Sequence, residues 1–459
     1  MAWGRRSLIR VLLLGLAAQL ALAEADVSPD TGAKAKADAP AAGSSEGLAY
    51  EAIEKADVYT GNATAEAAKG AGAGVAAKAA KAAKTVNAPV SPPVQGWWES
   101  KTCSGAYCVY TNLRIAQGRG LVMVSKFSDY QKMERVEDHI NKGDNRFEDP
   151  SLFAETEVVD KGTGLTASKN LRRGKNLMSW SPVLVVHKDL FKDVKKKDRR
   201  KLLEAAVGFL PDETRAKFDR QRTQGLSAGE GRKRRSIEDI LLGAPWEINL
   251  GYEDRAEDHA KHYVNYPEAA VLGHDCRPNV AAYIDNHLAL RATVARRTQA
   301  GEELTISYID PLLARNKRQK WVQKHRGLNK PCGCHACTAK GSAEELLASD
   351  ERVKELTETL AELKNHDSKT VTEDKIDRFL ALLDEERLHA KLAEGYEYAA
   401  LNYNYLGLDV KAKKYADLAV QAGIIEGGID SNDVVANRIF ASDIKGHWSH
   451  RFTLKRRGQ

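Results

Sequence analysis

The hydrophobic and polar positions divide the chain into a β-rich middle and a helical C-terminal part. Alternating or β-branched runs predict strands, and they fall at residues 107–111, 120–125, 153–159, 165–167, 177–180, 182–186, 281–284, 288–294 and 304–308. Between the sixth and the seventh of these strands the spacing of apolar residues becomes helical. The pattern therefore predicts a mixed α+β protein.

Helical spacing occurs in two separate stretches. The first covers about residues 188–260, where it predicts a helical insertion within the β-rich domain. The second runs over 341–423, where four successive apolar stripes predict a C-terminal helical domain. Small and aromatic residues alternate in its last helix pair, which is typical of helical repeats such as the tetratricopeptide hairpin. A plain helical bundle is the alternative.

The N-terminus has the order of a secretory signal peptide, with Arg5, Arg6 and Arg10 before the apolar stretch Val11–Leu22. We expect cleavage near Ala23. A short N-terminal anchor is the alternative, although twelve apolar residues fall short of the roughly 20 that a spanning helix needs. No other stretch approaches that length, so we expect no membrane span in the mature protein.

Composition sets the remaining boundaries. An Ala-, Lys- and Gly-rich segment after the signal lacks the residues to bury a core, and we expect a disordered tether there. The expected domains are a signal peptide at 1–23, the tether at 24–93, a β-containing segment at 94–150, the β-rich domain at 151–310, a cysteine-containing region at 311–340, the helical domain at 341–423 and a basic tail at 424–459.

Charge gives little support to nucleic-acid binding. The chain has 70 Lys and Arg against 63 Asp and Glu, a formal net charge of +7 that is spread over short runs. The signal peptide predicts the secretory pathway or an extracellular location. The run Arg232–Arg235 would serve as a nuclear signal if the N-terminus were not used, so the nucleus or cytoplasm is the alternative.

Four of the six cysteines suggest a metal site. Cys332, Cys334 and Cys337 form a Cys-x-Cys-x-x-Cys run, and tetrahedral zinc needs a fourth ligand. Cys276 is the candidate, and His335 competes with it. Four protein ligands leave no open position, so the zinc would be structural. The other pair, Cys103 and Cys108, is either a disulfide or two core thiols.

The motifs that carry chemistry follow one another in a recognisable order. They are Lys161-Gly162-Thr163-Gly164-Leu165, then Gly-His-Asp-Cys-Arg-Pro-Asn at 273–279, then Gly-Glu-Glu-Leu-Thr-Ile-Ser-Tyr at 301–308, then the cysteine run. This order and spacing resembles the SET-domain lysine methyltransferases. The insertion and the helical C-terminus look like the SMYD and fungal SET subgroup, without a MYND zinc finger. The resemblance implies a β-rich SET domain followed by a post-SET zinc loop.

The resemblance also implies a role for each motif. Gly162, Thr163, Gly164 and Leu165 would lie beside S-adenosylmethionine, with His274 and Tyr308 also at the cofactor. Tyr308 matches the catalytic tyrosine, Asn279 the residue that supports the core, and Cys276 the zinc ligand. Position 273 also belongs to the cofactor site, but Gly273 stands where the family has asparagine, which removes a side-chain contact.

Two functions follow from these residues. The first is S-adenosylmethionine-dependent protein-lysine N-methyltransferase activity, with a protein carrying the target lysine as partner and zinc as a structural ion. The chemistry needs a deprotonated amine, which an apolar channel favours and which the Tyr308 hydroxyl would orient. The second, motivated by Gly273, is a catalytically inactive SET-like zinc-binding module that binds another protein.

Overall fold

The computed structural model describes residues 96–142, 146–158, 162–222, 234–244, 246–250, 261–325 and 331–458. The predicted signal peptide (1–23), the tether (24–93) and the first half of the basic run at 232–235 lie outside the described residues. Among the described residues, no helix is both long and apolar enough to cross a membrane.

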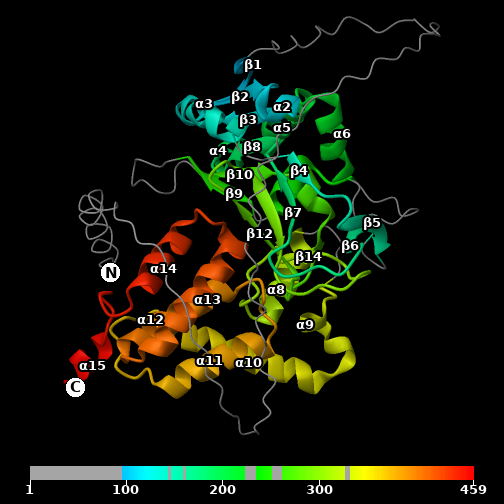
Figure 1. The fold of residues 1–459 in the computed structure, drawn as a ribbon. Helices are drawn as coiled ribbons and strands as arrows, with labels where there is room; N and C mark the ends of the chain where they lie inside the picture. Colours follow the sequence, from blue (N-terminus) through cyan, green and yellow to red (C-terminus); the bar gives the residue numbers. More distant parts are fainter. Residues whose placement is uncertain are drawn as a thin grey trace, which may run out of the picture. The chain divides into compact units, whose positions relative to one another are not determined.

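The largest sheet has six strands in the order β1-β2-β3-β8-β10-β9 (Figure 1). These strands are β1 (Trp98–Ser104), β2 (Tyr107–Asn112), β3 (Leu121–Ser125), β8 (Leu184–His187), β9 (Glu247–Asn249) and β10 (Lys261–Asn265). Neighbours are antiparallel except β3 and β8, which run parallel. The parallel pair lies in the middle of the sheet and is buried along its whole length, which explains its continuous apolar sequence.

The two faces of β3 contribute to different hydrophobic cores, because successive side chains on a strand point to opposite faces. Leu121 and Met123 belong to the core of the β-rich domain. Val122 and Val124 pack instead with the helical insertion. The sheet therefore separates the insertion from the strands that carry the candidate site.

Three smaller sheets hold the motif-bearing segments. A four-stranded sheet has the order β12-β13-β7-β4, β5 pairs with β6 as a hairpin, and β11 pairs in parallel with β14. Their bounds are β4 (Arg146–Glu148), β5 (Phe153–Val158), β6 (Gly162–Ala167), β7 (Asn176–Trp180), β11 (Gly273–His274), β12 (Val280–Ile284), β13 (Leu290–Val294) and β14 (Thr305–Ile306). The strand expected at 304–308 is thus shorter. Beyond it, the Ser307 hydroxyl donates a hydrogen bond to the carbonyl of Ile309, and such local bonds compete with strand pairing.

Helices follow the strands of the β-rich part at several points. They are α2 (Ile115–Gly118), α3 (Phe127–Lys142), α4 (Leu190–Asp193), α5 (Lys196–Gly208), α6 (Asp212–Arg220), α7 (Ile237–Leu242), the 3-10 helix η1 (Pro267–Val271) and α8 (Arg315–His325). The expected helical insertion is therefore present as α4 to α7. Its apolar stripe packs on the six-stranded sheet through Leu202, Leu203 and Ala206.

The C-terminal part is entirely helical (Figure 1). Its elements are α9 (His335–Thr338), η2 (Ala339–Gly341), α10 (Ala343–Leu363), α11 (Glu373–Glu385), α12 (Leu392–Tyr405), α13 (Asp409–Gly427), α14 (Asn432–Ser442) and α15 (Phe452–Arg457). Ser342, Thr372 and Ser431 cap the N-termini of α10, α11 and α14. Small alanines of α12 and α13 are buried where these two helices pack together.

Residues 424–458 differ from the basic tail that the sequence suggested. They complete α13 and form α14 and α15, and Phe440, Ala441 and Ile444 belong to the core of the helical domain. The basic residues of this stretch concentrate in the last turns of α15. A few apolar positions among polar ones were therefore enough to bury this segment.

Cys103 and Cys108 face each other across the β1–β2 hairpin and form a disulfide. Of the two readings that the sequence left open, the structure shows the disulfide. Cys276, Cys332, Cys334 and Cys337 are the free cysteines among the described residues.

Candidate active site and cysteine cluster

The β5–β6 hairpin carries the four residues at which the sequence places the Gly-x-Gly turn. Gly162, Thr163, Gly164 and Leu165 are the first four residues of β6. Gly162 has a φ of +76°, which residues with a side chain rarely adopt. At Gly164 a β-carbon would lie 2.8 Å from Cγ2 of Val158 on the neighbouring strand. Both glycines are therefore required, the first by its backbone conformation and the second by space.

Asn279 ties the segment after β11 to the segment before β14. Its side chain is 1% exposed, and its Oδ1 accepts a hydrogen bond from the backbone N–H of Thr305 at 2.8 Å. Its Nδ2 donates to the carbonyl of Glu303, also at 2.8 Å. A buried amide that is bonded on both sides holds two chain segments in fixed register. Asn279 therefore joins these two segments, and its supporting role in a SET domain stays a prediction from the sequence.

Gly273 leaves space that the Glu303 carboxylate occupies. An ideal β-carbon on Gly273 would lie 2.1 Å from Oε1 of Glu303 and 3.4 Å from Cγ2 of Thr305. The same Oε1 would lie 3.9 Å from a β-carbon on Gly164. The Gly-x-Gly hairpin and β11 thus approach one carboxylate. This contact could not be predicted from the sequence, because Glu303 stands next to a second glutamate in an ordinary turn motif.

Tyr308 is buried, and its hydroxyl lies among backbone oxygens. It is 2% exposed, and its hydroxyl lies 2.9 Å from the carbonyl oxygen of Ala269 and 3.0 Å from that of Leu272. Its backbone N–H donates to Nδ1 of His274 at 3.2 Å, so the histidine positions the tyrosine segment. Every residue has a backbone carbonyl, so the sequence could not indicate which two carbonyl oxygens would lie beside Tyr308.

Four of the candidate cofactor and catalytic residues line two different cavities, whereas Gly164, Gly273 and His274 line neither of them. The hairpin cavity, of about 440 Å³, is lined by Gly162, Thr163 and Leu165. The tyrosine cavity, also about 440 Å³, is lined by Tyr308. The two cavities have no lining residue in common. They are linked by η1, which lines the hairpin cavity and whose Ala269 carbonyl bonds the Tyr308 hydroxyl.

The two cavities differ in character. Four glutamates line the hairpin cavity, namely Glu148, Glu155, Glu157 and Glu268. The tyrosine cavity is largely apolar and includes Val280, Ala282 and Ile306. Glu426 also lines it and accepts the backbone N–H of Leu392 at 2.8 Å, at the start of α12. Burial raises the pKa of Glu426 to about 7.

Cys276, Cys332, Cys334 and Cys337 converge on one point. All four are buried, and their sulfur atoms lie within 4.8 Å of one another. The sulfurs of Cys276 and Cys337 are 3.7 Å apart, close to the roughly 3.8 Å between two sulfurs bound tetrahedrally at about 2.3 Å from zinc. His335 is exposed and lies outside this group. The donor set fits a closed tetrahedral zinc site.

Hydrogen bonding among the four thiols lowers the pKa of Cys334 and Cys337 and raises the pKa of Cys276 and Cys332. Hydrogen bonds from Cys276 and Cys332 lower the pKa of the Cys334 thiol to about 6. Hydrogen bonds from the other thiols, with Arg318 nearby, also lower the pKa of Cys337. Arg318 is 1% exposed and donates to the carbonyl of Pro311 at 3.2 Å. A buried guanidinium beside four sulfurs offsets their negative charge, and sequence reasoning missed it.

A buried ion-pair network joins the cysteine cluster to the helical domain. Arg277, next to Cys276, donates to Glu386, which also accepts from Arg352 at 2.7 Å and from the Ser349 hydroxyl at 2.9 Å. Burial opposes ionisation of Glu386, but the hydrogen bonds and charges of the two arginines lower its pKa. Sequence reasoning missed this link because its members are far apart in the chain.

A second buried group of metal-ligand type consists of Asp129 on α3 and of His187 and His262 on the six-stranded sheet. Nδ1 of His187 accepts the backbone N–H of Asp189 at 3.0 Å, while its Nε2 lies 3.2 Å from Asp129. In a neutral imidazole the proton must then sit on Nε2, where a metal would otherwise bind. We therefore interpret this group as a hydrogen-bonded network.

Comparison with known families assigns part of the chain. Residues 162–309 match the family model of the SET domain. Over 106 residues the chain is 37% identical to the histone-lysine N-methyltransferase SMYD3 of Mus musculus, and equally to that of Homo sapiens. Each alignment covers 22% of this chain and 24% of the relative, so the chain spans about a quarter of the length of these relatives.

Two further comparisons are weaker. A SET and MYND domain-containing protein of Dictyostelium discoideum is 35% identical over 78 residues, which cover 17% of this chain and 15% of that protein. The solved structure of ctPRC2 in an autoinhibited conformation bound to S-adenosylmethionine has 13% identity and a TM-score of 0.20, over 64% of this chain and 33% of that chain. A likeness at this TM-score bears on neither fold nor function. The match of residues 162–309 and the likeness to the SMYD3 relatives agree with the motif order, and this part of the chain is therefore a SET domain.

Proposed function

We propose that this chain is an S-adenosylmethionine-dependent protein-lysine N-methyltransferase. The observation that carries the proposal is the position of the Tyr308 hydroxyl, bonded to the carbonyl oxygens of Ala269 and Leu272. These oxygens lie where η1 links the hairpin cavity to the tyrosine cavity. A methyl donor in the first cavity and a target amine in the second would meet there.

The residues of the hairpin cavity fit this cofactor. Its four glutamates outnumber its two cations, Lys217 and Arg220, which suits a positively charged sulfonium ion, and Gly162 allows close approach to the backbone. Residues 162–165 and His274 would hold the cofactor, whereas Gly273 contributes no side chain. When bound, S-adenosylmethionine supplies an electrophilic methyl group on sulfur. The hydroxyl oxygen of Tyr308 and the carbonyl oxygens of Ala269 and Leu272 can accept weak C–H···O contacts from such a methyl group.

The tyrosine cavity fits the target amine. A lysine side chain has a reference pKa of about 10.4, and it must be neutral to attack. The apolar side chains of the lining disfavour the charged form and so lower that pKa, whereas the carboxyl groups of Asp310 and Glu426 act in the opposite direction. The Tyr308 hydroxyl directs its proton to the Ala269 or Leu272 carbonyl, which leaves an oxygen lone pair to orient the amine.

The cysteine cluster supports the site from outside. Zinc bound by Cys276 and the Cys332–Cys337 run would fix the segment that begins β12 to the region after α8. Its closed set of four sulfur ligands leaves no position for substrate. Its role would therefore be structural.

Transfer of a radiolabelled methyl group to arrays of lysine peptides tests the proposal. Tyr308→Phe should lower the transfer rate by about 100-fold or more, since it removes the group that orients the amine. Tyr107→Phe is the matched control, because it removes a buried hydroxyl that bonds Asp193 of the helical insertion at 2.7 Å and lines neither cavity. Peptides with arginine in place of lysine should remain unlabelled.

The alternative is a SET module without catalysis that binds another protein. The Glu303 carboxylate beside Gly273 favours this alternative, because it lies where the family's asparagine side chain would begin. Equal labelling by the wild type and Tyr308→Phe, or no labelling of any lysine peptide by a folded chain that binds the cofactor, would support it.

A further inference from the structure

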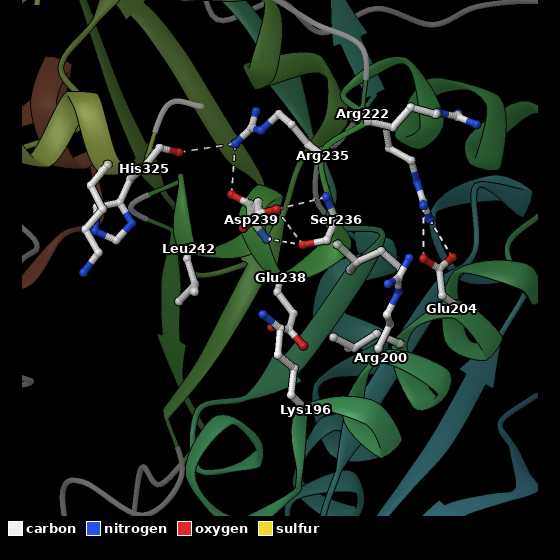
Figure 2. Close-up of a pocket in the computed structure, with 14 residues that line it drawn as sticks. Lys196, Arg200, Glu204, Arg222, Arg235, Ser236, Glu238, Asp239, Leu242 and His325 are labelled. Carbon is white, nitrogen blue, oxygen red and sulfur yellow. Dashed lines mark hydrogen bonds and ion pairs between the residues drawn. The ribbon is translucent and has the colours of Figure 1, made fainter. Parts of the chain in front are cut away.

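A cavity of about 750 Å³ lies outside the SET motifs, between the helical insertion and the end of α8. Lys196, Arg200, Leu203 and Glu204 form its α5 side, spaced so that they share one helix face. Figure 2 shows Lys196, Arg200 and Glu204 together, with Arg235 and His325 across the cavity.

The cavity has an excess of positive charge. Six cationic side chains line it, namely Lys196, Arg200, Arg222, Arg234, Arg235 and Lys324. Three acidic side chains line it, namely Glu204, Glu238 and Asp239. The partners of these acidic groups decide how much of the positive charge is left for a ligand.

Each acidic group is already engaged. Glu204 accepts two hydrogen bonds from Arg222, at 3.1 and 2.8 Å. Glu238 is paired with Arg199, which lies outside the cavity lining, at 2.9 and 3.1 Å. Asp239 accepts from the backbone and hydroxyl of Ser236 at the start of α7. Among the described lining residues, Asp239 is thus the one carboxylate that bonds neutral donors instead of an arginine, and its single charge leaves the cations in excess.

Four cations are available to a ligand. Lys196, Arg200, Arg234 and Lys324 are exposed, and none forms an ion pair within the part of the chain that the structure describes. Arg235 is held in place, since its Nη2 donates to the carbonyl of Asp239 at 2.9 Å. The cavity thus combines one fixed donor with exposed, mobile side-chain donors, and its lining also includes the apolar residues Leu203 and Leu242.

The lining favours one class of anion. Guanidinium groups bind phosphate through two parallel hydrogen bonds, and a cavity of this size suits a small molecule. His325 is the only ring side chain among the described lining residues, which offer the bases of single-stranded nucleic acid almost no stacking surface. We propose that this cavity binds a compact polyanion with two or more linked phosphate groups.

Calorimetric titration of sodium tripolyphosphate into the full chain tests the proposal. The wild type should bind one equivalent, and binding should weaken as ionic strength rises. The double variant Arg200→Ala/Lys324→Ala should bind about tenfold more weakly or worse, since each substitution removes a hydrogen bond to a charged group. Both side chains are exposed, so the melting temperature should not change.

The control is Arg297→Ala/Lys317→Ala, which removes an exposed arginine and an exposed lysine outside the cavity. It should bind tripolyphosphate within about twofold of the wild type. Phosphatidylcholine vesicles with and without phosphatidylinositol bisphosphate separate the two sources of such a ligand. Binding only to the vesicles that contain phosphatidylinositol bisphosphate identifies a lipid headgroup as the ligand. Binding to neither kind of vesicle identifies a soluble ligand.

Three results would overturn the proposal. The folded wild type fails to bind tripolyphosphate, or Arg200→Ala/Lys324→Ala binds it as tightly as the wild type. The third result is that single-stranded DNA displaces tripolyphosphate and binds far more tightly than tripolyphosphate does, through Arg200 and Lys324.

Discussion

A β-carbon on residue 273 would lie 2.1 Å from Oε1 of Glu303, so Gly273 and the Glu303 carboxylate share one space. The carboxylate also lies near Gly164, at 3.9 Å from the β-carbon that an alanine there would carry. The departure of Gly273 from the asparagine of SET proteins therefore has a structural counterpart. A residue with a side chain at 273 requires Glu303 to move.

We expect Gly273→Ala to destabilise the chain by about 1–3 kcal/mol, the usual cost of overpacking a filled site. Adding Glu303→Ala should relieve the clash, so the double variant should be more stable than the sum of the single effects by about 0.5–3 kcal/mol. Urea unfolding of the four proteins measures this coupling. Additive effects would show that the two residues do not compete for space.

Purified protein should contain about one zinc ion per chain, because the four cysteines provide one complete tetrahedral site. Cys276→Ser should lose the zinc and lower the melting temperature. The matched control, Cys103→Ser/Cys108→Ser, removes the disulfide pair and should retain the metal. Elemental analysis measures the zinc content of both variants. Two zinc ions per chain would contradict our interpretation of Asp129, His187 and His262 as a hydrogen-bonded network.

Stability should depend on pH through Glu386. Its pKa is lowered from 4.5 in the folded protein, so its contribution is complete above about pH 4.5 and is lost as pH falls through the folded pKa. Glu386→Gln should cost about 3 kcal/mol at pH 7, since it removes the buried carboxylate that Arg277 and Arg352 share. Its unfolding free energy should also vary less below pH 5 than that of the wild type.

Glu351→Gln is the control, because Glu351 is an exposed carboxylate on α10. It should leave both the stability and its pH dependence unchanged. Urea unfolding between pH 3.5 and 7 gives both quantities. Parallel pH profiles for the wild type and Glu386→Gln would show that another group controls acid stability.

Location remains a prediction from the sequence, since residues 1–23 lie outside the described part. We expect a reporter fused to residues 1–30 to enter the secretory pathway and to be cleaved near Ala23. The Cys103–Cys108 disulfide suits an oxidising compartment, and bound zinc would protect the other four thiols there. A reporter that stays uncleaved in the cytosol would favour the nuclear or cytoplasmic alternative.

The cysteine cluster shows what spacing can predict. Three thiolates within six residues required a fourth ligand, and the motif that contains Cys276 supplied the candidate that the structure brings to them. Strands β3 and β8 could also be predicted from the sequence, because continuous apolar runs suit a strand that is buried on both faces. Local pattern was sufficient in both cases.

Features that depend on tertiary contacts could not be predicted from the sequence. The pairing of Arg277 with Glu386 joins residues that are 109 positions apart, and charged residues of these types are common. The carbonyls of Ala269 and Leu272 belong to the backbone, so no residue type marks them. Burial of Phe440 depends on the packing of α14 against the other helices. The basic residues near the C-terminus suggested an exposed tail instead.

The most direct test of the account is calorimetric titration of S-adenosylmethionine into the zinc-loaded chain, because it requires no knowledge of the substrate. We predict saturable binding of one equivalent, which would show that the cofactor site tolerates Gly273 and the Glu303 carboxylate beside it. Absence of binding to a folded, zinc-replete sample would contradict the proposed methyltransferase and leave the SET domain as a binding module.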